Sequence, residues 1–211
     1  MNLLSLGSAQ RRLFAIHEAA VATTGAPRAA VLCYPWGAEY TYAHRSVRQL
    51  ALKLALSGCH TLRFDYFGTG DSGGDEFEAD LAGCESDVEA AMEALTDIAG
   101  TSQVTLIGLR AGANIAAGVA ARHASIVEAL VLWDPIVAEL RSLPGALPQR
   151  TAMFVTDSTE SRDRLVGLGF AGGTRPATIE FVPTQSPWVE SATMTGVLPV
   201  SVIQRVIEWL R

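Results

Sequence analysis

The sequence predicts an α/β protein in which a mostly parallel central sheet is covered by helices on both faces. Short runs with an apolar rather than an alternating pattern occur between segments whose apolar residues recur at helical spacing. This order is typical of parallel sheets buried on both sides. Glycine and proline mark the boundaries between the two kinds of segment. The 211 residues, 49% of them hydrophobic, suffice for one sizeable core. We therefore expect residues 1–211 to form a single domain.

Six short apolar runs predict the strands. They lie at residues 29–34, 60–65, 104–109, 126–133, 151–156 and 177–182. Their short length favours strands over helices, and the run at 29–34 (AAVLCY) is apolar throughout, as expected of a buried strand. The first run is followed by Pro35-Trp36-Gly37, which favours a turn, and the second opens into a glycine-rich loop at 67–74.

The segments between these runs predict helices. Apolar residues recur at helical spacing from Val47 to Leu54, and this helix is expected to end at Ser57-Gly58, where glycine can adopt the left-handed conformation of a C-cap. An apolar stripe from Leu81 to Leu95, with carboxylates on the opposite face, predicts a surface helix that ends at Gly100. The remaining predicted helices lie at 111–123, at 160–170 and from Pro199 onward, while 134–150 is ambiguous.

The composition argues against several classes of function. The net charge is −6 and the arginines are scattered, so nucleic acid is not an expected partner. The cysteines, Cys33, Cys59 and Cys84, are odd in number and form no C-x-x-C pair, which argues against disulfides and a structural metal. No targeting segment or membrane-length apolar stretch is recognisable. We expect a cytoplasmic protein without metal or cofactor.

Ligands of such a fold bind beyond the carboxyl ends of the parallel strands. The loops expected at this edge are 35–42, 65–74, the residues around Arg110, 133–136, Asp157 and the region of Ser186 and Trp188. The segment Gly108-Leu109-Arg110-Ala111-Gly112 lies between a predicted strand and a predicted helix, at the place of the G-x-S-x-G nucleophile elbow.

Together with residues 31–74, this elbow segment resembles the α/β hydrolases. The stretches VLCYPWGAEY, HRSVRQLA and LRFDYFGTGDSGG are similar to small serine aminopeptidase-like hydrolases found beside exopolysaccharide and exosortase genes. The resemblance covers roughly residues 13–135, and beyond them only the order of elements agrees. It implies a three-layer α/β-hydrolase sandwich, and the stretch 134–150 is too short to hold the cap domain of many relatives.

The sequence departs from the family pattern at the catalytic positions. Arg110 stands in place of the elbow serine and has no nucleophilic atom at neutral pH. The loop 183–199, where relatives place a histidine, contains none, because the histidines are His17, His44, His60 and His123. Asp157 could occupy the acid position, and Trp36-Gly37 replaces the His-Gly that contributes an oxyanion amide in relatives. Hydrolysis by an elbow serine is therefore not expected.

Three other side chains are candidates for chemistry. Ser72 lies in Gly70-Asp71-Ser72-Gly73, which is typical of a tight loop that bonds its own backbone. Cys33 lies among apolar residues of a predicted strand, which favours packing over thiolate chemistry. His44 either bonds Glu39 or a loop carbonyl, the favoured role, or acts as a general base at the strand ends.

Arg110 has two interpretations. An elbow side chain points into the site at a helix N-terminus, so Arg110 could anchor a carboxylate, phosphate or sulfate. Alternatively it pairs with Glu39, Asp65 or Asp134 and fills an inactive site. The expected binding residues are Trp36, Gly37, Glu39, Arg110, Ala111, Asp134 and Trp188. An open shelf of Trp36, Tyr66, Phe67 and Trp188 would suit a long acyl or aromatic ligand or another protein.

The leading hypothesis is a non-hydrolytic protein that binds an anionic acyl-type metabolite or a partner protein, as an accessory in a biosynthetic pathway. The alternative is an unconventional hydrolase, lyase or cyclase acting on an ester, thioester or amide. In that case Arg110 and backbone amides would stabilise negative charge, while His44, Glu39 or Asp134 would handle protons. A third hypothesis is an obligate subunit of a homo-oligomer or of a complex with another protein.

Overall fold

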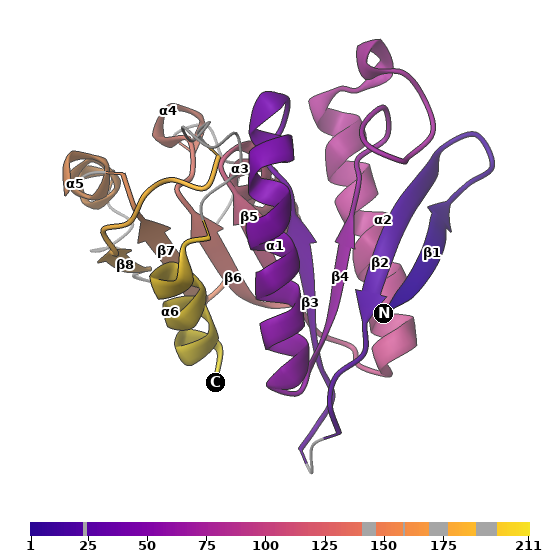
Figure 1. Cartoon of the computed structure of the whole chain (residues 1–211), viewed down its shortest axis with the longest axis horizontal. Helices are drawn as coiled ribbons and strands as arrows, with labels where there is room; N and C mark the ends of the chain where they lie inside the picture. The colour runs from indigo at the N-terminus through magenta and orange to yellow at the C-terminus, as the bar shows by residue number, and fades with distance from the viewer. Residues whose placement is uncertain (23–24, 141–146, 158, 169–176, 189–197) are drawn as a thin grey trace.

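The computed structural model describes residues 1–22, 25–140, 147–157, 159–168, 177–188 and 198–211 (Figure 1). The strands within these residues form one sheet in the order β1-β2-β4-β3-β5-β6-β7-β8. Their bounds are β1 Asn2–Gly7, β2 Arg12–Glu18, β3 Arg28–Cys33, β4 Cys59–Phe64, β5 Val104–Leu109, β6 Val127–Trp133, β7 Arg150–Val155 and β8 Thr178–Phe181. Strand β2 runs antiparallel to β1 and β4, and the other neighbours are parallel.

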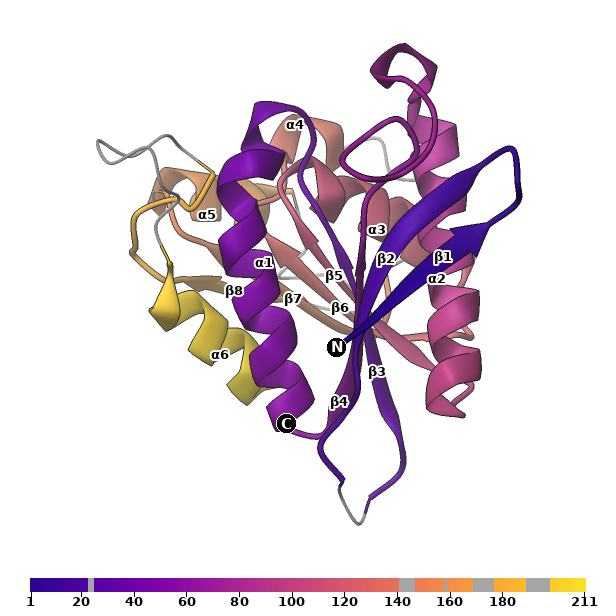
Figure 2. The ribbon, with the colours of Figure 1, turned by 45° about the vertical axis from the view of Figure 1, so that its right-hand side comes forward.

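Helices cover both faces of this sheet. They are α1 Ala38–Leu56, the short 3₁₀ helix η1 Glu76–Glu78, α2 Leu81–Ala99, α3 Ala111–Arg122, α4 Val137–Leu140, α5 Thr159–Gly167 and α6 Val200–Leu210. Helices α1 and α6 pack together on one face, and α2 and α3 pack together on the other (Figure 2). The predicted three-layer sandwich is confirmed. Between β6 and β7 the described residues contain only the short α4 and no cap domain.

The six predicted strands are present, and the ambiguous stretch 134–150 contains α4. The helix predicted at 160–170 is α5, whose described part ends at Gly167, and residues 169–170 lie outside the described residues. The hairpin β1–β2 was not predicted from the sequence. Strand β1 lies at the edge of the sheet, where it buries no residue fully, and such a strand lacks the continuous apolar run of the central strands.

The three cysteines lie in the core. Cys33 of β3, Cys59 of β4 and Cys84 of α2 are buried thiols without a disulfide. Burial raises the pKa of Cys33 and Cys84 to about 12 and that of Cys59 to about 11. The expectation that Cys33 serves packing is confirmed, because a thiol with such a pKa is not a nucleophile near neutral pH.

One carboxylate of α2 points inward, although the sequence predicted carboxylates on the outer face. Asp87 is only 1% exposed and accepts hydrogen bonds from Arg11 Nε at 2.6 Å and Nη2 at 3.0 Å. It also accepts the backbone N–H of Phe67 at 2.9 Å. Asp87 thus ties the turn between β1 and β2 to the loop after β4. Helices long and apolar enough to span a bilayer do not occur in the described part of the chain.

Candidate functional site

The turn between β5 and α3 has the geometry of a nucleophile elbow. Arg110 adopts φ 54° and ψ −123°, a conformation rare for residues with a side chain. A Cβ atom at Gly112 would lie 2.2 Å from the carbonyl oxygen of Tyr34, and one at Gly108 would lie 2.3 Å from the carbonyl oxygen of Gly112. Both glycines are required by this close approach, and the turn therefore directs the Arg110 side chain out of the sheet edge.

Arg110 is paired with Glu39 from the first turn of α1. Its Nε lies 3.2 Å and 3.3 Å from the two carboxylate oxygens of Glu39. Nη1 donates a long bond of 3.4 Å to the carbonyl oxygen of Asp134, and the guanidinium lies 5.6 Å from the ring centre of Trp188. The side chains of Arg110 and Glu39 remain 28% and 32% exposed. Glu39 accepts hydrogen bonds from Nε alone. Nη2 donates to none of the described residues.

Asp134 lies beside the elbow, directly after β6. It has a positive φ of 42° and is 4% exposed. Its Oδ1 accepts the backbone N–H of Thr156 at 2.7 Å, and its Oδ2 accepts the Thr156 hydroxyl. Burial raises the pKa of Asp134 to about 7, although the hydrogen bonds of Thr156 and the charge of Arg110 act in the opposite direction. Asp134 therefore titrates close to neutral pH.

A cavity of about 260 Å³ opens next to Arg110, and we call it the elbow cavity. It is lined by Arg110, Asp134, Pro135, Ile136, Val137, Ala138, Val155, Asp157, Ser161, Arg164 and Leu165. Asp157, the candidate acid, is exposed here and accepts a hydrogen bond from Ser161 Oγ at 3.0 Å. Ser161 and Arg164 were not predicted as site residues, because their approach to the cavity depends on how α5 packs over β7 and β8.

Trp36 and Gly37 line a different hollow, of about 230 Å³, between the loops after β3 and β4. Trp36 stacks on Tyr66 with ring centres 6.1 Å apart. Gly37 has φ 63° and precedes α1. At the elbow, the backbone N–H of Ala111 donates to none of the described residues, as expected for the first turn of a helix. Of the predicted binding residues, Trp36 and Gly37 line this hollow, and Arg110 and Asp134 line the elbow cavity. Glu39 and Trp188 contact Arg110.

The four residues expected to form an open aromatic shelf do not share one exposed surface; they are Trp36, Tyr66, Phe67 and Trp188. Tyr66 is buried, and Trp188 is buried with its ring against Trp133 at 6.0 Å and an interplanar angle of 78°. Phe67 is partly covered by the guanidinium of Arg11, which lies 4.6 Å from its ring centre. Trp36 and Phe67 remain partly exposed, and of these two Trp36 lines the hollow.

His44 lies away from Arg110. Its ring stacks on Tyr34, with centres 5.6 Å apart, and meets Tyr40 edge-on at 5.9 Å. Burial, the largest cause, lowers the pKa of His44. Ser72 serves its loop, as predicted: its hydroxyl donates to the carbonyl oxygen of Asp65 at 2.6 Å and accepts the N–H of Phe14 at 2.9 Å. Within the described ranges, no three His, Cys, Asp or Glu side chains are grouped to hold a metal ion.

Comparison with known proteins places this geometry in a family. The sequence profile of the family described as serine aminopeptidase, S33 matches residues 25–161. A lidless α/β serine hydrolase from Xanthomonas campestris is 18% identical, with a TM-score of 0.79, and the match covers 100% of this chain and 93% of that one. An α/β serine hydrolase homologue from Coxiella burnetii is 17% identical, with a TM-score of 0.78 and coverage of 100% and 97%.

A dienelactone hydrolase from Anabaena variabilis is 18% identical, with a TM-score of 0.75 and coverage of 99% of this chain and 95% of that one. No curated protein matches the sequence. The solved structures support the fold, whereas the profile match extends over more than half of the chain and includes the elbow. This chain therefore belongs to the serine aminopeptidase S33 family within the α/β hydrolases.

Proposed function

We propose that this chain is a non-hydrolytic member of its family that binds a small anionic, acyl-type ligand in the elbow cavity. The observation that carries the proposal is the side chain at the elbow, Arg110. A guanidinium stays protonated at neutral pH and cannot attack an acyl carbon, but its planar donors suit a carboxylate. The sequence contains no histidine after His123, so the loops after β7 and β8 offer no imidazole as a base.

The pairing of Arg110 with Glu39 is compatible with ligand binding. Glu39 occupies Nε, so the edge formed by Nη1 and Nη2 can receive a second carboxylate side by side with the first. The N-terminus of α3, which begins at Ala111 directly after Arg110, adds a dipole that favours negative charge near the elbow. Apolar side chains of Ile136 and Leu165 line the cavity and suit the acyl part of the ligand.

The first experiment measures turnover of a panel of acyl esters and thioesters by the wild-type protein and by Arg110→Ala, at matched concentrations of folded protein. We expect turnover in neither protein, because no activated nucleophile stands at the elbow. Turnover by the wild type that disappears in Arg110→Ala would overturn the proposal and make the chain an enzyme with a mechanism of its own.

The second experiment measures binding of butyrate by calorimetry at constant ionic strength. We expect Arg110→Gln to abolish saturable binding and Glu39→Gln to strengthen it severalfold, because the second variant removes a competing carboxylate. Arg162→Gln is the control, since it removes an exposed positive charge on α5 outside the cavity. Equal affinity in Arg110→Gln and wild type would contradict the anchor role.

One observation favours a catalytic alternative. Asp134 lines the same cavity as Arg110 and has a pKa of about 7, which suits a general acid or base near neutral pH. In such an enzyme Asp134 would move the proton and Arg110 would stabilise developing negative charge. The alternative predicts turnover of the ester panel whose rate changes with pH around 7, and a loss of this pH dependence in Asp134→Asn. The non-hydrolytic proposal predicts no turnover at any pH.

A further inference from the structure

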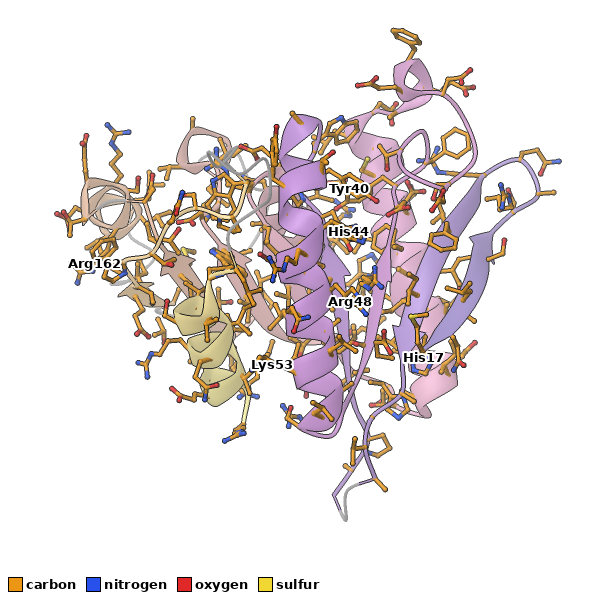
Figure 3. All side chains as sticks on the ribbon, viewed as in Figure 1. His17, Tyr40, His44, Arg48, Lys53 and Arg162 are labelled. Carbon is orange, nitrogen blue, oxygen red and sulfur yellow. The ribbon has the colours of Figure 1, made fainter. Side chains whose placement is uncertain are left out.

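A third cavity, of about 340 Å³, lies between α1 and the sheet face formed by β2 and β4. We call it the α1 cavity. Tyr40, His44 and Arg48 line it from successive turns of α1 (Figure 3), since residues four apart share one helix face. Opposite them lies Arg63 of β4, which is paired in register with Ile16 of β2. Among the described residues, the α1 cavity shares no lining residue with the elbow cavity.

Arg63 is a buried cation without an acidic partner. It is 4% exposed and belongs to none of the ion pairs formed in the described part of the chain. Its Nη1 donates a long bond of 3.4 Å to the hydroxyl of Tyr34, and its Nε is buried with no hydrogen-bond partner. Burying a charge in this state is costly unless an anion compensates it. The cavity in front of Arg63 offers the space for such an anion.

The cationic side of the cavity extends to the helix. Arg48 lines the cavity from α1 and is exposed, and it too belongs to none of the ion pairs between described residues. The positive field of the two arginines also acts on His44, whose pKa is lowered first by burial and then by Arg63, with Arg48 adding to the effect. An anion placed between α1 and β4 would therefore meet two guanidinium groups.

The acidic residues of this cavity do not neutralise Arg63. Asp65 is buried and already accepts two hydrogen bonds, from the Tyr40 hydroxyl to Oδ1 at 2.7 Å and from the N–H of Asp71 to Oδ2 at 3.0 Å. Asp71 is exposed at the rim. These carboxylates oppose the lowering of the pKa of His44, but neither lies within ion-pair distance of Arg63.

The rest of the lining is largely aromatic. It includes Phe14 of β2, Tyr34 after β3, Tyr40 of α1 and Phe64 of β4. Aromatic rings favour flat apolar groups through stacked and edge-on contacts. A hydrated inorganic anion would leave these rings unused, whereas an anion joined to a ring or a flat acyl group would contact them.

We propose that the α1 cavity is a second binding site, specific for a carboxylate that carries an aromatic or other flat apolar group. Arg63 and Arg48 hold the carboxylate by charge-assisted hydrogen bonds, and the aromatic lining holds the apolar group. The α1 cavity does not include the elbow, so ligand binding there is independent of the function proposed for Arg110.

The test is a titration with sodium benzoate at constant ionic strength, followed by NMR through the ring protons of His44. This readout is local to the α1 cavity, because His44 lines it and lies outside the elbow cavity. We expect saturable shifts in the wild type, at least tenfold weaker binding in Arg63→Met and severalfold weaker binding in Arg48→Gln. Binding should be unchanged in Arg45→Gln, an exposed position on α1 outside the lining, and in Arg110→Gln.

Two further probes examine the chemistry of the site. Inorganic phosphate should bind more weakly than benzoate, and benzyl alcohol, which lacks the charge, should not bind. Tighter binding of phosphate would overturn the apolar part of the proposal, and the absence of saturable His44 shifts with benzoate would overturn all of it.

The stability of the Arg63 variant gives an independent readout. Without ligand, Arg63→Met should unfold at a higher temperature than the wild type, because it removes an unpaired buried charge. A lower unfolding temperature would show that Arg63 also stabilises the folded chain, and the test of binding then rests on Arg48→Gln. If Arg63→Met does not fold, Arg48→Gln decides the matter, and wild-type affinity in that variant would overturn the site.

Discussion

Asn114 and Ile136 are joined by two reciprocal hydrogen bonds: Asn114 Nδ2 donates to the carbonyl oxygen of Ile136, and the N–H of Ile136 donates to Asn114 Oδ1, each at 2.9 Å. Asn114 lies in the first turn of α3, just after the elbow, and Ile136 lies in the loop after β6. The amide side chain is suited to this role because it carries one donor group and one acceptor. The pair fixes one wall of the elbow cavity relative to Arg110.

Replacement of this asparagine should destabilise the protein. We expect Asn114→Ala to lower the free energy of unfolding by about 2 kcal/mol, since it removes both hydrogen bonds and leaves the N–H of Ile136 without its partner. The carbonyl oxygen of Ile136 keeps a longer bond, from the N–H of Leu140 at 3.3 Å. Asn114→Asp should also destabilise, because a carboxylate cannot donate to the Ile136 carbonyl oxygen. Urea unfolding of both variants checks this, and a loss below ~0.5 kcal/mol would show that water replaces the side chain.

The glycine that follows the elbow should tolerate no side chain. In Gly112→Ala the new Cβ would lie 2.2 Å from the carbonyl oxygen of Tyr34, so we expect a loss of about 3 kcal/mol or failure to fold. Gly167→Ala is the matched control, since a Cβ there meets nothing within 4 Å and alanine favours the helix. The midpoint temperature of thermal unfolding should fall in Gly112→Ala and rise in Gly167→Ala.

Backbone strain at the elbow predicts an order of stability among two Arg110 variants. Both Arg110→Ala and Arg110→Gly lose the pair with Glu39 and the contact with Trp188. Only glycine adopts φ 54° without a steric penalty. We expect the free energy of unfolding of the glycine variant to exceed that of the alanine variant by about 1 kcal/mol. This figure includes the opposing effect of glycine, which raises the conformational entropy of the unfolded chain. The reverse order in chemical denaturation would argue that the elbow relaxes when the arginine is removed.

Asp134 should make the stability depend on pH. Its pKa of about 7 lies above the value of ~3.9 for an unfolded aspartate, so the folded protein binds the extra proton between these values. The contribution of Asp134 to the free energy of unfolding therefore falls as pH rises through this window, by up to ~1.4 kcal/mol per pH unit. Asp134→Asn lacks this contribution.

The check on Asp134 is urea unfolding of the wild type and Asp134→Asn between pH 4 and pH 8. The free energy of unfolding of the wild type should fall relative to that of the variant as pH rises. The difference between the two should become constant above neutral pH. Asp163→Asn, which removes an exposed carboxylate of α5, controls for net charge. A constant difference across the range would mean that Asp134 is ionised throughout.

The ion pair between Arg11 and the buried Asp87 of α2 yields a further prediction about stability. Asp87→Asn should cost about 2–3 kcal/mol, because it leaves Arg11 without its charge partner and weakens the bond to the N–H of Phe67. The effect should persist at high salt, since Asp87 is buried. Glu85→Gln, also on α2, affects a more exposed pair with Arg122 of α3 and should cost much less.

The central sheet could be predicted because its strands are buried on both faces. Every residue of β5, Val104–Leu109, is buried, so the sequence carries an uninterrupted apolar signal. Strand β1 at the edge has no such signal, and the antiparallel hairpin was missed for this reason. On α2, periodicity assigned Asp87 to the outer face, but its partner Arg11 lies 76 residues earlier in the sequence, and such a pairing leaves no local trace.

The candidate site could be predicted only in outline. The motif located Arg110 and its glycines, because the elbow is a local turn. Which of three carboxylates would face the guanidinium depends on the direction of α1, and the structure selects Glu39. The α1 cavity was not foreseen, because Arg63 and Arg48 come from a strand and a helix whose packing alone brings them to one space.

The rates at which the buried thiols are alkylated would report how often this core opens. Cys33, Cys59 and Cys84 belong to β3, β4 and α2, which adjoin one another around the centre of the sheet. An alkylating reagent at neutral pH can modify them only in molecules whose core has opened, because the native thiols are both inaccessible and protonated. Equal labelling rates at the three positions would show that the two strands and the helix separate together, whereas unequal rates would rank the elements by how often each detaches.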